Sequence, residues 1–115
     1  MKRGEIYWAE LAPRSGAEQK GRRPVLVVSH DAFNRIQGWK SIVVVPLSTS
    51  SRQAMRGPTT VEIPASTASL TKTSIVVCHQ ITTLDRSKLT RRIGLLPAQL
   101  MKDVEQSTKA ALDMD

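Results

Sequence analysis

Two polar residues at the ends of apolar segments could act on a phosphate group. Arg23 directly precedes the apolar run 24–28, and Ser48 directly follows the run 42–47. An arginine held by a rigid strand can grip a phosphate through two parallel hydrogen bonds, and a hydroxyl can donate to a phosphoryl oxygen. The same residues could instead be a surface arginine beside a strand and a serine that satisfies strand-end backbone groups. Both interpretations stay open on the residues alone.

Positive charge is concentrated around these two positions. Eight basic and two acidic residues lie between positions 14 and 56, which places +6 of the net charge of +7 in this stretch. Segments 13–22 and 49–58 lack a periodic apolar pattern and are predicted to be loops held by strands, where binding residues commonly lie. If both loops share a face, they form a groove that attracts a phosphate backbone. A merely solvated basic surface is the alternative, and Phe33 and Trp39 could either stack on bases or be buried.

The histidines and the cysteine suggest no further chemistry. His79 shares strand parity with Ile75 and Val77 and is expected to pack in the core or at an interface, whereas His30 could cap a short helix or lie on the surface. One cysteine, Cys78, cannot form an internal disulfide, and the set lacks the spacing of a metal site. We therefore expect no metal ion and no cofactor.

Short β-branched and aromatic runs separated by turn residues predict a mainly β protein, either a small barrel or a sandwich-like sheet. Strands are expected at residues 4–12, 24–28, 42–47, 61–63, 74–81 and 89–95. The runs 24–28 and 42–47 are continuous, so they should be central and buried; Pro24 should open its strand and Pro46 should lie near an end or edge. A short helix is predicted at 31–37 with Ser29 or Asp31 as its cap, and a longer helix after Pro97 should cover one end of the sheet.

Length and composition limit the class of protein. A chain of 115 residues has room for one core, so residues 1–115 are expected to form a single domain. Its 40% apolar and 23% charged residues are typical of a globular protein, and a pI near 10.2 favours a polyanionic partner such as nucleic acid. The longest apolar run has six residues, far fewer than the roughly 18–20 that span a membrane, and no apolar signal segment follows the N-terminus. The cytoplasm is the expected compartment.

An ordered series of segments resembles the MazF/PemK family of toxin endoribonucleases from bacterial toxin–antitoxin pairs. The matching stretches cover nearly the whole chain: 3–8, Pro13, 16–19, 23–29, Asn34, 43–48, 70–74, 80–86 and 93–94. Each stretch is weak evidence alone, but the complete series in order is specific. The resemblance implies an SH3-like small β-barrel of the MazF, CcdB and Kid type with a C-terminal helix. It also implies a homodimer and a cognate antitoxin whose acidic, disordered tail occupies the RNA groove.

The resemblance further implies a metal-independent enzyme that cuts single-stranded RNA, chiefly mRNA, at short sequence motifs. In the family the 2′-hydroxyl of the substrate attacks the adjacent phosphate and leaves a 2′,3′-cyclic phosphate and a 5′-hydroxyl end. Arg23 matches the arginine before proline and would stabilise the phosphorane, and Ser48 stands where many members have threonine and would hydrogen-bond the scissile phosphate. Glu18 matches the Gly-x-Glu-Gln pattern of the first loop and would orient the site or take the 2′ proton, or else only pair with Lys20 or Arg22. The residues expected to contact RNA are Gln19, Lys20, Arg22, Arg52, Arg56 and Gln80, although Gln80 could instead be buried in the sheet.

Two other functions are compatible with such a chain. A CcdB-like toxin binds gyrase through a C-terminal Trp-Gly-Ile sequence, whereas this chain ends with residues 111–115, Ala-Leu-Asp-Met-Asp. A non-catalytic nucleic-acid-binding barrel would share the basic charge, and Arg23 and Ser48 would then affect affinity alone. A decayed toxin that binds its antitoxin without turnover is a variant of the second alternative, because Ser48 departs from the family's threonine.

Overall fold

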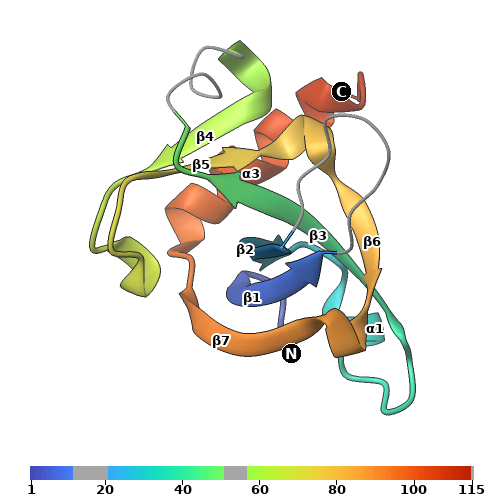
Figure 1. The fold of residues 1–115 in the computed structure, drawn as a ribbon. Helices are drawn as coiled ribbons and strands as arrows, with labels where there is room; N and C mark the ends of the chain where they lie inside the picture. Colours follow the sequence, from blue (N-terminus) through green and yellow to red (C-terminus); the bar gives the residue numbers. More distant parts are fainter. Residues whose placement is uncertain (12–20, 51–56, 115) are drawn as a thin grey trace.

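The computed structural model describes residues 1–11, 21–50 and 57–114. Within them, seven strands form an antiparallel sheet of order β4-β5-β3-β2-β1-β7, with β6 paired to β3 beside this path. The strands are β1 (Glu5–Leu11), β2 (Gly21–Val27), β3 (Ser41–Ser48), β4 (Thr60–Ile63), β5 (Ser74–Val77), β6 (Thr82–Asp85) and β7 (Leu89–Leu95). Figure 1 shows the strands curving around a common interior, with the C-terminal helix α3 (Ala98–Ala111) beside β4 and β5. The predicted mainly β, barrel-like fold with a C-terminal helix is confirmed, although the sheet is not strictly closed.

Two apolar clusters lie on opposite faces of the central strands. Val45 of β3 packs in the cluster that contains Leu26 and the α3 residue Val104. Its neighbour Val44 packs in the second cluster, with Val25 and Ile42. Because adjacent side chains of a strand point to opposite faces, β3 is covered on both sides. This two-sided burial is the reason that its apolar run is continuous rather than alternating.

The two prolines lie where strand pairing is interrupted. β2 starts at Gly21, so the prediction that Pro24 opens the strand is wrong. Residues 21–24 pair with β1 on one side, but pairing of β2 with β3 on the other side begins only at Val25. The side of Pro24 that faces away from β1 is therefore an unpaired edge, where proline is tolerated. Pro46 lies near the end of β3 as predicted, between the residues that pair with β6 and those that pair with β5.

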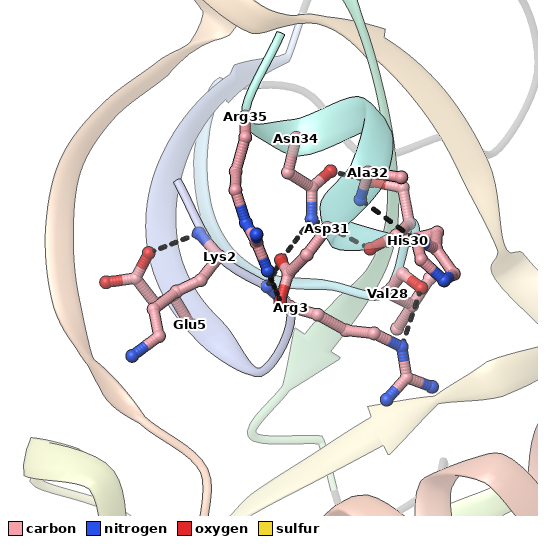
Figure 2. Close-up of polar contacts among 10 residues, drawn as sticks. Lys2, Arg3, Glu5, Val28, His30, Asp31, Ala32, Asn34 and Arg35 are labelled. Carbon is pink, nitrogen blue, oxygen red and sulfur yellow. Dashed lines mark hydrogen bonds and ion pairs between the residues drawn. The ribbon is translucent and has the colours of Figure 1, made fainter.

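The first helix, α1 (Asp31–Asn34), is a single turn, shorter than the predicted 31–37. Its cap is His30, whose Nδ1 accepts a hydrogen bond from the backbone N of Ala32 at 2.9 Å, rather than Ser29 or Asp31. Both of those side chains serve other contacts: the Ser29 hydroxyl donates to Asn34, and Asp31 accepts the backbone N–H of Arg3 at 2.7 Å. Figure 2 shows this network, which ties the helix to the N-terminal segment.

The predicted strand 74–81 ends early. β5 stops at Val77, and the 3₁₀ turn η3 (Cys78–Gln80) leads into β6. Because the chain leaves the sheet there, the alternation that would have packed His79 is broken. His79 is exposed, and its Nδ1 lies 2.8 Å from the Thr59 hydroxyl, so the expectation that it packs in the core is wrong. Among the described residues, no helix is long and apolar enough to cross a membrane.

Candidate functional site

A cleft of about 880 Å³ opens where residues of β2, β3 and β7 meet the segment that leads into β5. The strand pairings explain its walls, because β1 pairs with β2 on one side and with β7 on the other, and Trp8 is in register with Arg91. None of the described residues that line the cleft is acidic, and five are cationic: Arg22, Arg23, Lys72, Arg91 and Arg92. Such a surface favours a ligand with several negative charges.

Arg23 is the cation in this cleft whose guanidinium is most withdrawn from water. It lies in β2 opposite Ala9 of β1, and its Nη1 atom is buried with no hydrogen-bond partner among the described residues. Burial lowers the pKa of the Arg23 guanidinium, as expected for a cation moved out of water. A buried donor without a partner is costly, and a small turn of the Arg23 side chain toward the cleft that it lines would let an anionic oxygen satisfy it with a charge-assisted hydrogen bond. The arrangement suits a phosphate.

Ser48 lines the same cleft at the end of β3, in register with Ile75 of β5. Its Oγ accepts a hydrogen bond from the backbone N of Ser50 at 3.0 Å, so the hydroxyl does satisfy a strand-end backbone group. That bond uses Ser48 as an acceptor, and a hydroxyl can donate its own proton at the same time. Both sequence interpretations of Ser48 are therefore compatible within one geometry.

Arg22 and Trp8 form a flat surface on the cleft wall. The guanidinium carbon of Arg22 lies 4.5 Å from the centroid of the Trp8 ring, a cation–π arrangement. Both groups are planar, and planar groups of this kind stack on the faces of unpaired bases. This wall can hold a base beside a phosphate bound at Arg23.

Arg92 is held by a buried carboxylate. Its Nε forms a short ion pair with Glu5, which also accepts the backbone N–H of Lys2 at 2.6 Å and the hydroxyl of Tyr7 at 3.2 Å. Burial acts to raise the pKa of Glu5, but these hydrogen bonds outweigh it and the pKa is lowered. Burial, together with the Glu5 charge, raises the pKa of Tyr7. The result is an oriented guanidinium whose charge is partly balanced.

The structure brings together three of the residues predicted from sequence: Arg22, Arg23 and Ser48. Gln80 is exposed at the end of η3, neither buried in the sheet nor among the residues that line the cleft, so its RNA contact stays a prediction. The remaining predicted site residues lie outside the described part of the chain: Glu18, Gln19, Lys20, Arg52 and Arg56.

Sequence reasoning missed four residues of the cleft. Trp8, Lys72, Arg91 and Arg92 lie outside the basic stretch 14–56, and the fold brings them beside it. The one signal that could have indicated two of them is the adjacent pair Arg91–Arg92 inside a predicted strand, because two consecutive charges break the alternation of a half-buried strand. In the described residues, no group of three His, Cys, Asp or Glu side chains could hold a metal ion.

A protein-family model and characterised relatives both match nearly the whole chain. A family model described as "PemK-like, MazF-like toxin of type II toxin-antitoxin system" matches residues 2–112. The chain is 40% identical over 114 residues to Endoribonuclease MazF6 of Mycobacterium tuberculosis, and the aligned region covers 99% of this chain and 98% of that protein. It is 36% identical over 112 residues to Endoribonuclease EndoA of Bacillus subtilis, covering 97% of this chain and 94% of that protein.

Solved structures of similar proteins share the fold. One is an endoribonuclease in complex with its cognate antitoxin from a mycobacterial species, with a TM-score of 0.81, 27% identity and coverage of 100% of this chain and 97% of that one. Another is MazF from Deinococcus radiodurans, with a TM-score of 0.78, 28% identity and coverage of 99% and 97%. The described strands and C-terminal helix thus have close counterparts in these structures.

Proposed function

The chain belongs to the PemK-like, MazF-like toxin family of type II toxin–antitoxin systems and is an endoribonuclease, and from this premise we propose how it cuts RNA. The substrate is single-stranded RNA, chiefly mRNA, cut at a short sequence motif without a metal ion. The products are a 2′,3′-cyclic phosphate and a 5′-hydroxyl end. The observation that carries this proposal is the buried, unpartnered Nη1 of Arg23 in a cleft whose described lining is basic.

The proposed reaction balances with RNA and protein groups alone. A base takes the proton of the 2′-hydroxyl, the 2′-oxygen bonds to phosphorus, and the bond from phosphorus to the 5′-oxygen breaks. The leaving 5′-oxygen takes up a proton from the protonated base, so the proton removed from the 2′-hydroxyl is returned overall. Between these events the phosphorane carries extra negative charge, and donors placed around it lower the barrier.

Arg23 supplies the main stabilisation in this scheme, because it lines the cleft and a turn of its guanidinium would bring the unpartnered Nη1 to a phosphorane oxygen as charge develops. An arginine is too firmly protonated to be an easy base, so its role is electrostatic. Ser48 donates its hydroxyl proton to a second oxygen of the same phosphate. Glu18, in the first loop, orients the site or takes the 2′ proton.

Base recognition would come from the cleft wall and from the two loops. The stacked surface of Trp8 and Arg22 supports one base next to the scissile phosphate. Lys72 and Arg91 hold neighbouring phosphates, together with Gln19, Lys20, Arg52, Arg56 and Gln80 from the sequence prediction.

The same basic cleft supports the proposal of a protein partner. An acidic, disordered antitoxin segment would be complementary in charge to the cleft and would exclude RNA by occupying it. Among similar structures, one endoribonuclease is described in complex with its cognate antitoxin. We extend the proposal to a single toxin domain over residues 1–115 that acts as a homodimer, with support from the family match over residues 2–112.

The test is incubation of the purified protein with a long mRNA in EDTA, followed by mapping of the new ends. Polynucleotide kinase labels 5′-hydroxyl ends without prior phosphatase treatment, which identifies the chemistry. Discrete cuts with such ends are expected, and Arg23→Ala should abolish them. The matched control is Lys109→Ala, which removes an exposed cation from α3, distant in sequence from every residue of the cleft.

Three other results would count against the proposal. Cleavage that requires a divalent cation would refute metal independence, and 5′-phosphate ends would refute 2′-hydroxyl attack. RNA that is bound but stays intact would favour a non-catalytic or decayed protein.

A further inference from the structure

Two aromatic rings lie stacked at the surface, Phe33 of α1 and Trp39 of the turn that follows it. The ring centroids of Phe33 and Trp39 are 5.3 Å apart, with 30° between the ring planes. Phe33 is 47% exposed and Trp39 is 42% exposed, and Ile36 between them is also exposed. Large aromatic side chains contribute most when they bury their area, so an exposed stacked pair offers an apolar face to a ligand. We call this pair, with its turn, the aromatic platform.

Hydrogen bonds from Arg86 and from the α1 network fix the backbone of the platform. Arg86 donates from Nε to the carbonyl oxygen of Trp39 at 2.9 Å and from Nη1 to the carbonyl oxygen of Asn34 at 2.8 Å. The buried Asn34 side chain donates to Asp31, and Figure 2 shows how that carboxylate is also bound by the N-terminal segment. Both ends of the turn are therefore fixed, and a surface fixed before binding loses less conformational entropy when a ligand arrives.

The charge around the platform favours an anionic ligand. Segments 31–40 and 85–88 hold four cations, Arg35, Lys40, Arg86 and Lys88, and two carboxylates, Asp31 and Asp85, so their net charge is +2. Arg35 forms an ion pair with Asp31 at 4.0 Å, and Arg86 uses its donors on backbone carbonyls, so Lys40 and Lys88 are the cations best placed to meet an anion. Exposed aromatic faces together with basic side chains are the combination that binds unpaired nucleotides.

We propose that the aromatic platform is a second contact site for single-stranded RNA, outside the cleft, on which an unpaired base stacks. Lys40, which adjoins Trp39 in the chain, would lie near a flanking phosphate. Figure 1 shows the turn after α1 at the start of β3, the opposite end from the arrowhead where Ser48 lies in the cleft. The eight residues of β3 separate the two sites by about 23 Å at the usual rise per residue. The platform would thus raise affinity for longer RNA without touching the scissile phosphate.

This inference rests on the proposed function. The two tryptophans allow RNA binding in the cleft and RNA binding on the platform to be tested separately. Trp8 lines the cleft and Trp39 belongs to the platform, and the chain has no other tryptophan. In an Arg23→Ala background that prevents cleavage, Trp8→Phe leaves Trp39 as the sole fluorescent reporter. Trp39→Phe leaves Trp8. Both proteins are titrated with RNA oligomers of about 4 and about 12 nucleotides, within the site sizes of small β domains.

Saturable quenching of Trp39 by the longer RNA is the expected result. Phe33→Ala and Lys40→Glu, made separately in the Arg23→Ala background, should each weaken binding of the longer RNA by about 5-fold or more and leave the affinity for the shorter RNA unchanged. Leu112→Ala is the matched control, because it removes a similarly exposed apolar side chain at the end of α3. Thermal unfolding of each variant confirms that the protein remains folded, and Lys40→Glu leaves both rings in place.

Several outcomes overturn the proposal. Quenching of Trp8 with an unchanged Trp39 signal means that RNA occupies the cleft alone, and the proposed function then stands without the platform. Unchanged signals from both tryptophans contradict the proposed function as well. If Trp39 emission depends on protein concentration without RNA, and the platform variants convert a dimer to a monomer in sedimentation, the platform is an interface between two copies of the chain.

Discussion

Replacing Arg23 by methionine should separate catalytic activity from stability. The buried Nη1 of Arg23 has no hydrogen-bond partner in the described structure, and an unsatisfied buried donor costs about 1–3 kcal/mol. Methionine keeps an apolar stem of similar length and removes that donor. We expect the free energy of unfolding to be unchanged or to rise by about 1 kcal/mol, which is an increase of about 4 °C in the unfolding midpoint for a domain of this size.

The rate of RNA cleavage by Arg23→Met should fall, although its stability should not. Loss of one preorganised donor to a developing oxyanion lowers kcat by about 100- to 1000-fold. The binding of uncleaved RNA should weaken much less, because several other cations line the cleft. The assay combines single-turnover cleavage of a short RNA with urea unfolding followed by tryptophan fluorescence.

Arg86→Met is the matched control, since it makes the same substitution at an arginine whose donors are used. Arg86 donates to the carbonyl oxygens of Trp39 and Asn34, so its removal should lower stability by about 2–3 kcal/mol. The reasoning fails if Arg23→Met destabilises the fold by more than about 2 kcal/mol, because Arg23 would then be a structural residue. It also fails if Arg23→Met cleaves RNA at the normal rate.

Four further predictions follow from the same geometry. Ser48→Ala should lower kcat by about 10- to 1000-fold with little change in KM, as loss of one transition-state hydrogen bond requires; an unchanged kcat in single-turnover kinetics would remove Ser48 from the site. The pKa of Glu5 is lower in the folded chain than in the unfolded chain, so its carboxylate stabilises the fold above the unfolded value of about 4.3, and this contribution is lost as the pH falls through the folded value. Glu5→Gln should therefore be less stable than the parent at pH 7 and approach it in urea titrations as the pH falls below the unfolded value and through the lower folded value, and a stability difference independent of pH would contradict the assignment. Lys72→Ala should reduce the slope of log affinity for RNA against log salt concentration by about 0.7, the value for one phosphate contact on a single strand, and an unchanged slope would mean that Lys72 meets no phosphate. A Cβ at Gly94 would overlap the backbone carbonyl oxygen of Ala68, so Gly94→Ala should displace that cleft-side segment, lower stability by about 1–3 kcal/mol and slow cleavage; normal thermal unfolding would show that the segment yields easily.

The Gly94 contact shows how the cleft depends on backbone packing as well as on charged side chains. Ala68 belongs to the 3₁₀ turn η2 (Thr67–Ser69), and it and the nearby residues Ser66 and Ser69 have positive backbone φ angles. Such angles are costly for residues with a Cβ and persist where the surroundings impose them. The absence of a side chain at Gly94 lets β7 approach this turn, which then leads into the cleft residues Leu70 and Lys72.

Six of the seven described strands and the two helices were readable from the sequence because their signals are local, whereas β6 (Thr82–Asp85) was not predicted. Continuous apolar runs marked β2 and β3 since both faces of these strands are buried, and helical spacing marked α3 through Met101 and Val104. Boundaries were less accurate where tertiary context decided them. β2 extends back to Gly21 because β1 offers a pairing edge, and β5 ends at Val77 because the chain turns toward β6.

The sequence by itself determined the fold class, the basic charge, the family and the candidates Arg23 and Ser48, because these follow from local runs and from motifs in order. Tertiary structure alone decided which residues share the cleft. Lys72 and Arg91 join Arg23 only through the pairing of β1 with β7 and the packing of the turn before β5, contacts between segments far apart in the chain. It also decided that Nη1 of Arg23 is buried without a partner and that Phe33 and Trp39 stack in the open. Whether a polar group is paired or an aromatic ring is covered depends on every element that packs around it, and no local pattern of residues records that.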